Sequence, residues 1–186
     1  MEPLRTITSQ DKMVWVTQPR EVVSVMQRTS DAYSIAQGKF EESGNTELVM
    51  QTAEAFGRGV FADQVKKKPK QWTMKEWMQV VTRDVLNPLG IGATITELTE
   101  DTARSVVFRL PLHEDAKDPH LASLFTYGFL RGLLCSVFPE GEVIMKSTMA
   151  TGAPMTSLVF KTSPIQGVSP ERERVKEVFT TMKKDA

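Results

Sequence analysis

The stretch from Ile91 to Ser163 constrains the fold more than any other part of the chain. Two runs of β type come first, a helix that is apolar on nearly every side follows, and two more β runs complete the stretch. A helix of that kind is buried on most of its faces, and paired alternating runs indicate hairpins. The pattern predicts an α+β fold: a small antiparallel four-stranded sheet (ββ-α-ββ) packed with helices, with extra N-terminal helices.

The side chains of each β run alternate between two faces. In the first hairpin we expect Ile91, Ala93 and Ile95 on one side of the first strand. In its second strand we expect Val106, Phe108 and Leu110 on one side. The second hairpin is expected over 143–149 and 155–161, and residues 111–117 are expected to form a polar loop. Asp118 is a suitable N-cap for the helix between the hairpins, and Pro119 suits its first turn.

Capping residues place three helices ahead of the sheet. The first begins at Pro19 and ends at Gly44, the second has Asn45 as its N-cap, and the third begins at the capping box Thr73–Glu76 and runs to about residue 86. We divide the chain into an N-terminal extension with a helix at 1–45, a central domain at 46–163 and a C-terminal helix at 164–186.

Glycines inside two of the helices indicate close packing. Gly57 and Gly59 lie in the second helix, and Gly128 and Gly132 lie in the helix between the hairpins. A glycine inside a helix costs roughly 1 kcal/mol relative to alanine, and the close approach of another backbone is a reason to accept that cost. We expect a homodimer in which Gly57 and Gly59 pack across a two-fold axis.

Charge and cysteine content narrow the classes of function. Lys plus Arg and Asp plus Glu number 23 each among the 186 residues, so no long-range field attracts nucleic acid or an anionic membrane. The lysines at 66–70 are interpreted as a solvated helix end, with a phosphate or nucleic-acid patch as the minority interpretation.

The single cysteine, Cys135, excludes an internal disulfide. Without a signal-peptide pattern or a membrane-spanning run, we expect a soluble cytoplasmic protein.

The chain offers few candidate catalytic groups. His113 and His120 flank a loop that carries Glu114, Asp115 and Asp118. Two histidines and a carboxylate are metal ligands in some proteins, but we favour a solvated surface because no short spacing preorganises these residues. No phosphate-binding glycine loop and no nucleophile elbow is present. We therefore predict no catalytic residue, no cofactor and no metal.

Three short motifs follow one another between Ala55 and Phe160: Ala55–Gly59 in a helix, Tyr127–Leu134 in the apolar helix, and Met149–Pro154 at the turn of the second hairpin. In order and spacing they resemble the 4-vinyl reductase domain family, also called hydrocarbon-binding. The resemblance implies a domain that holds a small apolar or aromatic molecule in an internal pocket. Family members often bind zinc near this turn; aligned on Gly152, this chain has Met145, Thr148 and Thr156 instead, which are poor zinc ligands.

The resemblance and the shortage of polar groups predict a protein that binds an apolar small molecule, as a sensor or carrier, without membrane insertion. The residues expected to bind the ligand are Trp77 near the mouth, Phe108, Phe125, Phe129, Arg131, Leu133, Met145 and Phe160. Arg131 either reaches the surface or pairs with a carboxylate of the ligand.

Two alternatives belong to other classes of protein. One is a structural or scaffolding subunit whose pocket is filled by side chains. The other is an enzyme that acts on a tetrapyrrole-like apolar substrate. A filled cavity would favour the scaffold, whereas a cleft with convergent polar groups near His113 or Arg131 would favour the enzyme.

Overall fold

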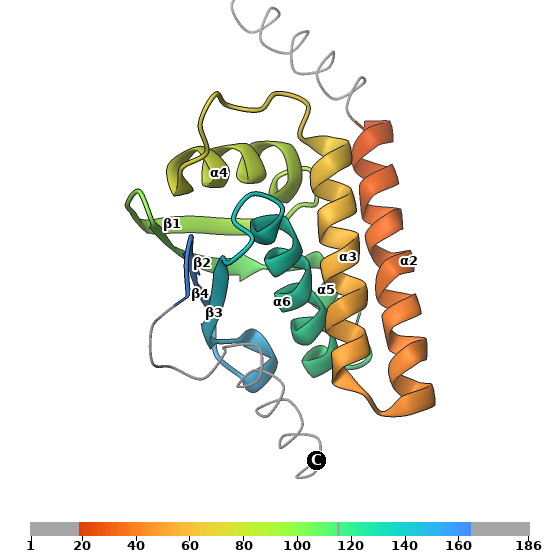
Figure 1. Cartoon of the computed structure of the whole chain (residues 1–186). Helices are drawn as coiled ribbons and strands as arrows, with labels where there is room; N and C mark the ends of the chain where they lie inside the picture. Colours follow the sequence, from red (N-terminus) through yellow and green to blue (C-terminus); the bar gives the residue numbers. More distant parts are fainter. Residues whose placement is uncertain (1–18, 115, 165–186) are drawn as a thin grey trace, which may run out of the picture.

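The computed structural model describes residues 19–114 and 116–164 (Figure 1). Its elements, in chain order, are α2 (Pro19–Ser43), α3 (Thr46–Gln64), α4 (Met74–Val81), a π-helical turn η1 (Thr82–Leu86), β1 (Gly92–Leu98), β2 (Thr102–Arg109), α5 (Pro111–Glu114), α6 (Pro119–Cys135), β3 (Glu142–Ser147), a 3₁₀ turn η2 (Met149–Thr151) and β4 (Thr156–Lys161). The C-terminal helix predicted at 164–186 lies, beyond Pro164, outside the described residues.

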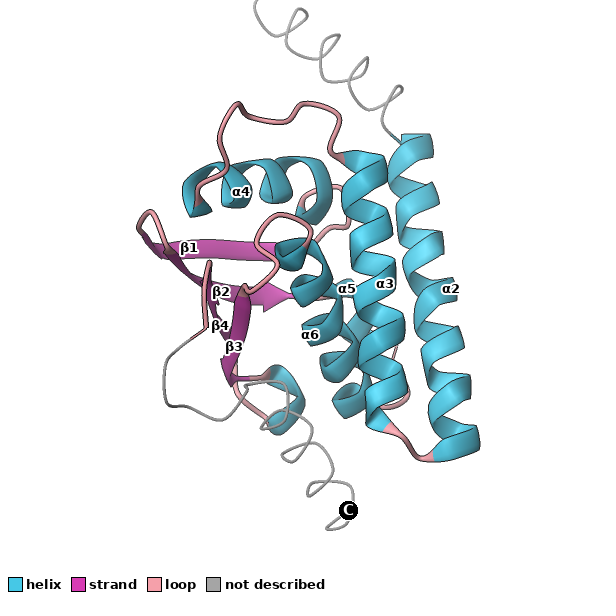
Figure 2. Cartoon of the chain, in the orientation of Figure 1, coloured by secondary structure: helices cyan, strands magenta, loops and turns pink. Residues whose placement is uncertain are grey.

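The four strands form one antiparallel sheet in the order β1-β2-β4-β3, which confirms the predicted α+β fold. α6 lies between this sheet and α3, and α2 lies on the far side of α3 (Figure 2). α4 lies across the end of the sheet beside β1 (Figure 1). The face of the sheet that meets α6, called here the inner face, is apolar and buried: Val143, Phe160 and Ala103 stand in one row across three strands.

The register of β2 corrects the predicted face of this strand. Val107 pairs with Ala93 on one side and with Thr156 on the other, and it is buried with Ser105 and Ala103 on the inner face. Val106 and Phe108 therefore point to the outer face. Both faces of β2 carry apolar residues, so alternation alone could not decide between them; the pairing with neighbouring strands does.

The predicted caps are confirmed. The side chain of Asn45 accepts a hydrogen bond from the amide of Glu47, that of Thr73 from the amide of Glu76, and that of Asp118 from the amides at the start of α6. The predicted polar loop after β2 differs from the structure, because Pro111 opens the single helical turn α5. Proline is favoured at a first helical position for its fixed φ.

α3 and α6 pack through glycines. A Cβ on Gly57 would stand 2.3 Å from the carbonyl oxygen of Phe129, and a Cβ on Gly132 would stand 2.3 Å from the carbonyl oxygen of Glu54. A Cβ on Gly128 would meet Met50 at 2.9 Å. The close approach predicted from these glycines is confirmed, but it joins two helices of one chain. Gly59 has open space around it, so the reason first given for a homodimer does not hold.

No helix among the described residues is both long and apolar enough to cross a bilayer.

Candidate ligand-binding pocket

A pocket of about 320 Å³ lies between the inner face of the sheet, α6 and the π-helical turn. We call it the sheet pocket. It is lined by Met78, Thr82 and Leu86 from α4 and η1, Ile91 from the connection, Ala93, Thr94 and Ile95 from β1, Ser105, Val107 and Leu110 from β2 and its end, Thr126 and Leu130 from α6, and Leu158 and Phe160 from β4. Secondary-structure elements, rather than long loops, thus supply most of the wall.

The wall of the sheet pocket is mostly aliphatic. Its polar side chains are hydroxyls only, and none of the described lining residues carries an ionisable group. Most of the wall is buried, but Ile95 is 39% exposed, so the pocket reaches solvent beside the edge strand β1. Such a site can hold an apolar molecule, and it contains no group for acid–base catalysis.

The π-helical turn shapes one side of the sheet pocket. The amide of Asn87 donates to the carbonyl oxygen of Thr82 at 2.9 Å, five residues back, where a regular α-helix would bond four residues back. Thr82 and Leu86, at the two ends of this turn, both line the pocket. Such single π turns are frequent at functional sites.

A second, smaller pocket adjoins the first and is called the α2 pocket. Its volume is about 110 Å³, and its lining includes Met26, Thr29 and Ser30 of α2 together with Phe125 and Phe129 of α6. It shares Ile91, Leu110 and Thr126 with the sheet pocket. The three shared side chains separate the two spaces, and α6 borders both.

Tyr33 supports the wall of the α2 pocket from α2. Its ring meets the Phe125 ring edge-on, with the centroids 5.5 Å apart. Burial, together with the charges of Asp118 and Glu41, raises the pKa of Tyr33 to about 12. The hydroxyl is therefore neutral at physiological pH, and it donates to the carbonyl oxygen of Asp118 at 3.4 Å.

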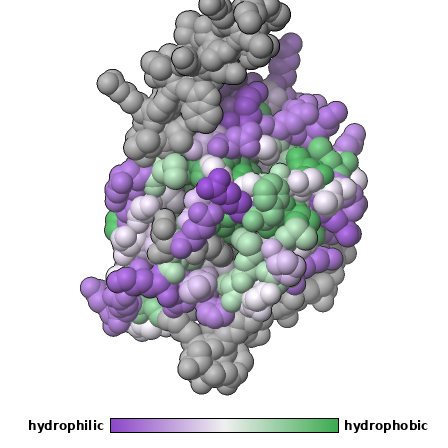
Figure 3. Space-filling view, turned by 180° about the vertical axis from the view of Figure 1, so that it is seen from behind, coloured by the Kyte–Doolittle hydropathy of each residue, from purple (hydrophilic) through white to green (hydrophobic). Residues whose placement is uncertain are grey.

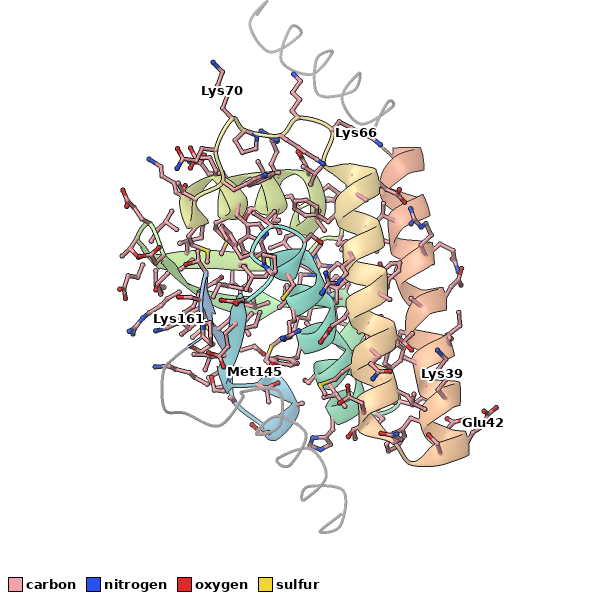
Figure 4. The ribbon with its side chains drawn as sticks, viewed as in Figure 1. Lys39, Glu42, Lys66, Lys70, Met145 and Lys161 are labelled. Carbon is pink, nitrogen blue, oxygen red and sulfur yellow. The ribbon has the colours of Figure 1, made fainter. Side chains whose placement is uncertain are left out.

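The structure separates the residues predicted to bind a ligand. Phe160 lines the sheet pocket, and Phe125 and Phe129 line the α2 pocket. Leu133 and Met145 are buried in the core and line neither pocket; Met145 comes from β3, at the other edge of the sheet (Figure 4). These five of the predicted lining residues are thus divided between two pockets and the core.

Trp77 is not at the mouth of a pocket. It is fully buried, its Nε1–H donates to the carbonyl oxygen of Leu133 at 3.2 Å, and its ring lies 5.3 Å from that of Phe160. Since this hydrogen bond satisfies the buried indole, Trp77 ties α4 to α6 and holds the Phe160 wall in place.

Phe108 and Arg131 also lie away from the sheet pocket. Phe108 is 56% exposed on the outer face, where its ring covers Gly92. Arg131 forms an ion pair with Glu54 of α3 at 3.2 Å. Burial lowers the pKa of Arg131, while the neighbouring Cys135 and Glu54 raise it, and the net shift is upward. The guanidinium therefore stays charged and joins two helices.

Sequence reasoning missed most of the sheet pocket. The unpredicted lining comprises Met78, Thr82, Leu86, Ile91, Ala93, Thr94, Ile95, Ser105, Val107, Leu110, Thr126, Leu130 and Leu158. One signal was available: Ser105 alternates with Ala103 and Val107 on one side of its strand, and Thr126 lies in the apolar helix. A hydroxyl buried at such a position needs a specific partner. The π turn leaves no comparable mark in the sequence.

Thr148 and Thr156, two of the residues aligned with the family's zinc ligands, form hydrogen bonds within the protein. The Thr148 hydroxyl lies 2.9 Å from that of Ser123, and the Thr156 hydroxyl accepts from the amide of Met149 at 3.1 Å. Among the described residues, no group of three or more His, Cys, Asp or Glu side chains is placed to hold a metal.

The lysines at 66–70 lie on the connection between α3 and α4, at one end of the molecule (Figure 4). Lys66 and Lys70 are exposed there. The adjacent Trp72 packs on Phe61, with ring centroids 5.8 Å apart. This contact joins the connection to the C-terminal part of α3.

Comparison with known proteins identifies a shared fold. No family model and no curated protein matches the chain. Subunit 3 of a trafficking protein particle complex from Naegleria fowleri, covalently bound to palmitic acid, aligns with a TM-score of 0.56 and 13% identity over 75% of this chain and 95% of that one. Two H-NOX structures from Shewanella oneidensis, in the Fe(II)NO and Fe(II)CO states, align with TM-scores of 0.47 and 0.48 at 13% and 14% identity, covering 83% and 87% of this chain and 96% and 97% of theirs.

Proposed function

We propose that this protein binds an apolar small molecule non-covalently in the sheet pocket and acts as a sensor or carrier. The observation that carries the proposal is the unfilled space of about 320 Å³ between α6, the sheet and the π turn. Its size lies at the lower end of the range of small-molecule sites, and its chemistry, apolar walls with a few hydroxyls, is typical of them.

The wall of the sheet pocket offers apolar surface to a ligand. Burial of apolar surface stabilises a complex by roughly 25 cal/mol per Å² before the costs of association. The mostly aliphatic lining of the pocket supplies such surface on the sheet, on α6 and on the π turn.

The shared fold of the trafficking subunit supports the proposal that this protein binds an apolar molecule. That protein holds a palmitic acid covalently. Here Cys135 lines neither pocket, and its Sγ lies 3.6 Å from the carbonyl oxygen of Gly141. We therefore propose reversible binding without a thiol attachment. Membership of the 4-vinyl reductase family stays a prediction that rests on the three motifs.

The alternatives receive less support. A scaffold with a filled pocket would lack the space between β1 and α6. An enzyme would need convergent polar groups, but Arg131 is engaged by Glu54 and the described lining of the sheet pocket has no ionisable side chain. The side chain of His113 lies outside the described part of the chain.

We also propose that the protein is a homodimer, with β1 in the interface. β1 is an edge strand, and Ile95 and Leu98 on it are exposed apolar residues. Exposed edges of this kind are prone to pair with another chain. Apolar side chains also gather on the face turned away in Figure 1, within a hydrophilic rim (Figure 3).

Paired substitutions on β2 test the binding function. Val107→Phe adds volume to the wall of the sheet pocket, whereas Val106→Phe makes the same change on the outer face one residue away. With naphthalene as the probe, calorimetric titration should show binding to the natural protein and to Val106→Phe, and a loss of at least about tenfold in affinity for Val107→Phe. Equal affinities in all three proteins, or no binding to any of them, would overturn the proposal.

A further inference from the structure

We propose that the sheet pocket selects an uncharged molecule of about two fused rings that donates one hydrogen bond to Oγ1 of Thr126. This inference rests on the proposed function and adds to it the chemical class of the ligand. Three observations support it: the wall carries no charged side chain, two of its hydroxyls already donate a hydrogen bond within the protein, and the pocket has a defined volume.

The charge of the wall excludes ionised ligands. The sheet pocket has no ionisable group among its described lining residues. Charged residues that adjoin lining residues along the chain, among them Arg83, Arg104 and Lys161, do not themselves line the space. A carboxylate or ammonium in the pocket would lose its hydration without gaining a partner, which is strongly unfavourable.

Two of the hydroxyls in the wall already donate their proton to a carbonyl oxygen of the protein. Thr126 Oγ1 donates to the carbonyl oxygen of Ala122 at 2.8 Å, and Ser105 Oγ donates to the carbonyl oxygen of Thr94 at 3.3 Å. Each hydroxyl has one proton and two lone pairs. With the proton used inside the protein, the oxygen remains as an acceptor. Thr126 and Ser105 therefore favour a ligand that donates over one that can only accept.

Thr126 is the better placed of these two acceptors. Its bond to Ala122 is the shorter, and it is the only polar residue shared by the sheet pocket and the α2 pocket among their described linings. A ligand that reaches Thr126 stands at the junction of the two spaces, with its apolar body against Val107 and Leu158.

The volume sets the size of the ligand. An engineered apolar cavity of about 150 Å³ holds one benzene molecule. The sheet pocket, at about 320 Å³, is roughly twice as large. Two fused rings fit this space, and a single ring would leave much of it empty.

Matched naphthalenes test the inference on the full chain at pH 7. The compounds are 2-naphthol, which donates, naphthalene and 2-methoxynaphthalene, which do not, and 2-naphthoate, which is charged. We expect 2-naphthol to bind about three- to tenfold more tightly than naphthalene, as one net hydrogen bond predicts, and more tightly than 2-methoxynaphthalene. We expect 2-naphthoate to bind at least about a hundredfold more weakly than 2-naphthol.

Thr126→Val should remove the preference for 2-naphthol, measured within this variant as the ratio of its affinities for 2-naphthol and naphthalene. Ser136→Ala is the control: Ser136 makes the same bond to a carbonyl four residues back, Gly132 at 2.8 Å, at the end of α6 and outside the pocket. It should keep the preference.

The outcomes separate this inference from the proposed function. Tight binding of 2-naphthoate, or a preference for 2-naphthol that survives Thr126→Val, would overturn the inference while pocket binding stands. Failure of every compound to bind the natural protein would overturn both. If Thr126→Val loses the preference for 2-naphthol and Ser136→Ala keeps it, the result supports both the inference and the proposed function.

Discussion

At the scale of single residues, two glycines of α3 are separated by one residue and have opposite surroundings. Gly57 faces the backbone of α6, and Gly59 faces open space. Gly57→Ala should lower the free energy of unfolding by roughly 1–3 kcal/mol, because its methyl group would force the two helices apart. Gly59→Ala should raise it by up to about 1 kcal/mol through helix propensity. Urea denaturation measures both, and a destabilised Gly59→Ala or an unaffected Gly57→Ala would refute the packing described.

The buried tyrosine gives a prediction for alkaline pH. The pKa of Tyr33 is raised to about 12 by burial and by Asp118 and Glu41, whereas an unfolded tyrosine ionises near 10. Above about pH 10 the folded state holds more protons than the unfolded state, so stability should fall as the pH rises toward 12. Thermal unfolding of the natural protein and of Tyr33→Phe should show a steeper loss in the natural protein; parallel curves would contradict the burial.

At the scale of secondary-structure elements, the π turn is the feature that shapes the sheet pocket. Deleting Arg83, which is exposed, should restore α-helical bonding between α4 and Asn87. Leu86 would then rotate away from the pocket, and binding of naphthalene should weaken while unfolding remains cooperative. Circular dichroism and calorimetry check the two parts. Unchanged affinity with an intact fold would show that the turn does not shape the site.

Features that depend on residues close together in the sequence could be predicted, whereas features that depend on contacts between distant segments could not. Asn45, Thr73 and Asp118 act on amides within three residues, so the sequence alone places the starts of α3, α4 and α6. The inner face of β2 depends on pairing with β1 and β4, and Phe108 was assigned to the wrong face for that reason. The sheet pocket joins α4, β1, β2, α6 and β4, so only the tertiary arrangement shows it.

At the scale of the whole molecule, the proposed dimer can be tested through β1. Leu98→Lys places a charge on the exposed edge strand, and Met155→Lys places one on another exposed apolar residue, ahead of β4. Light scattering at micromolar concentration should give a dimer for the natural protein and for Met155→Lys, and a monomer for Leu98→Lys. A monomeric natural protein at all concentrations would refute the dimer.

The proposed binding site is the space between β1, α6 and the π turn. A crystal structure of the protein soaked with 2-bromonaphthalene tests it, because anomalous scattering locates the bromine independently of the protein phases. We expect a bromine peak inside the sheet pocket, in contact with the walls formed by Val107 and Leu158. A structure in which Ile95 and Leu86 close over that space, with no bromine peak in it, would refute binding there.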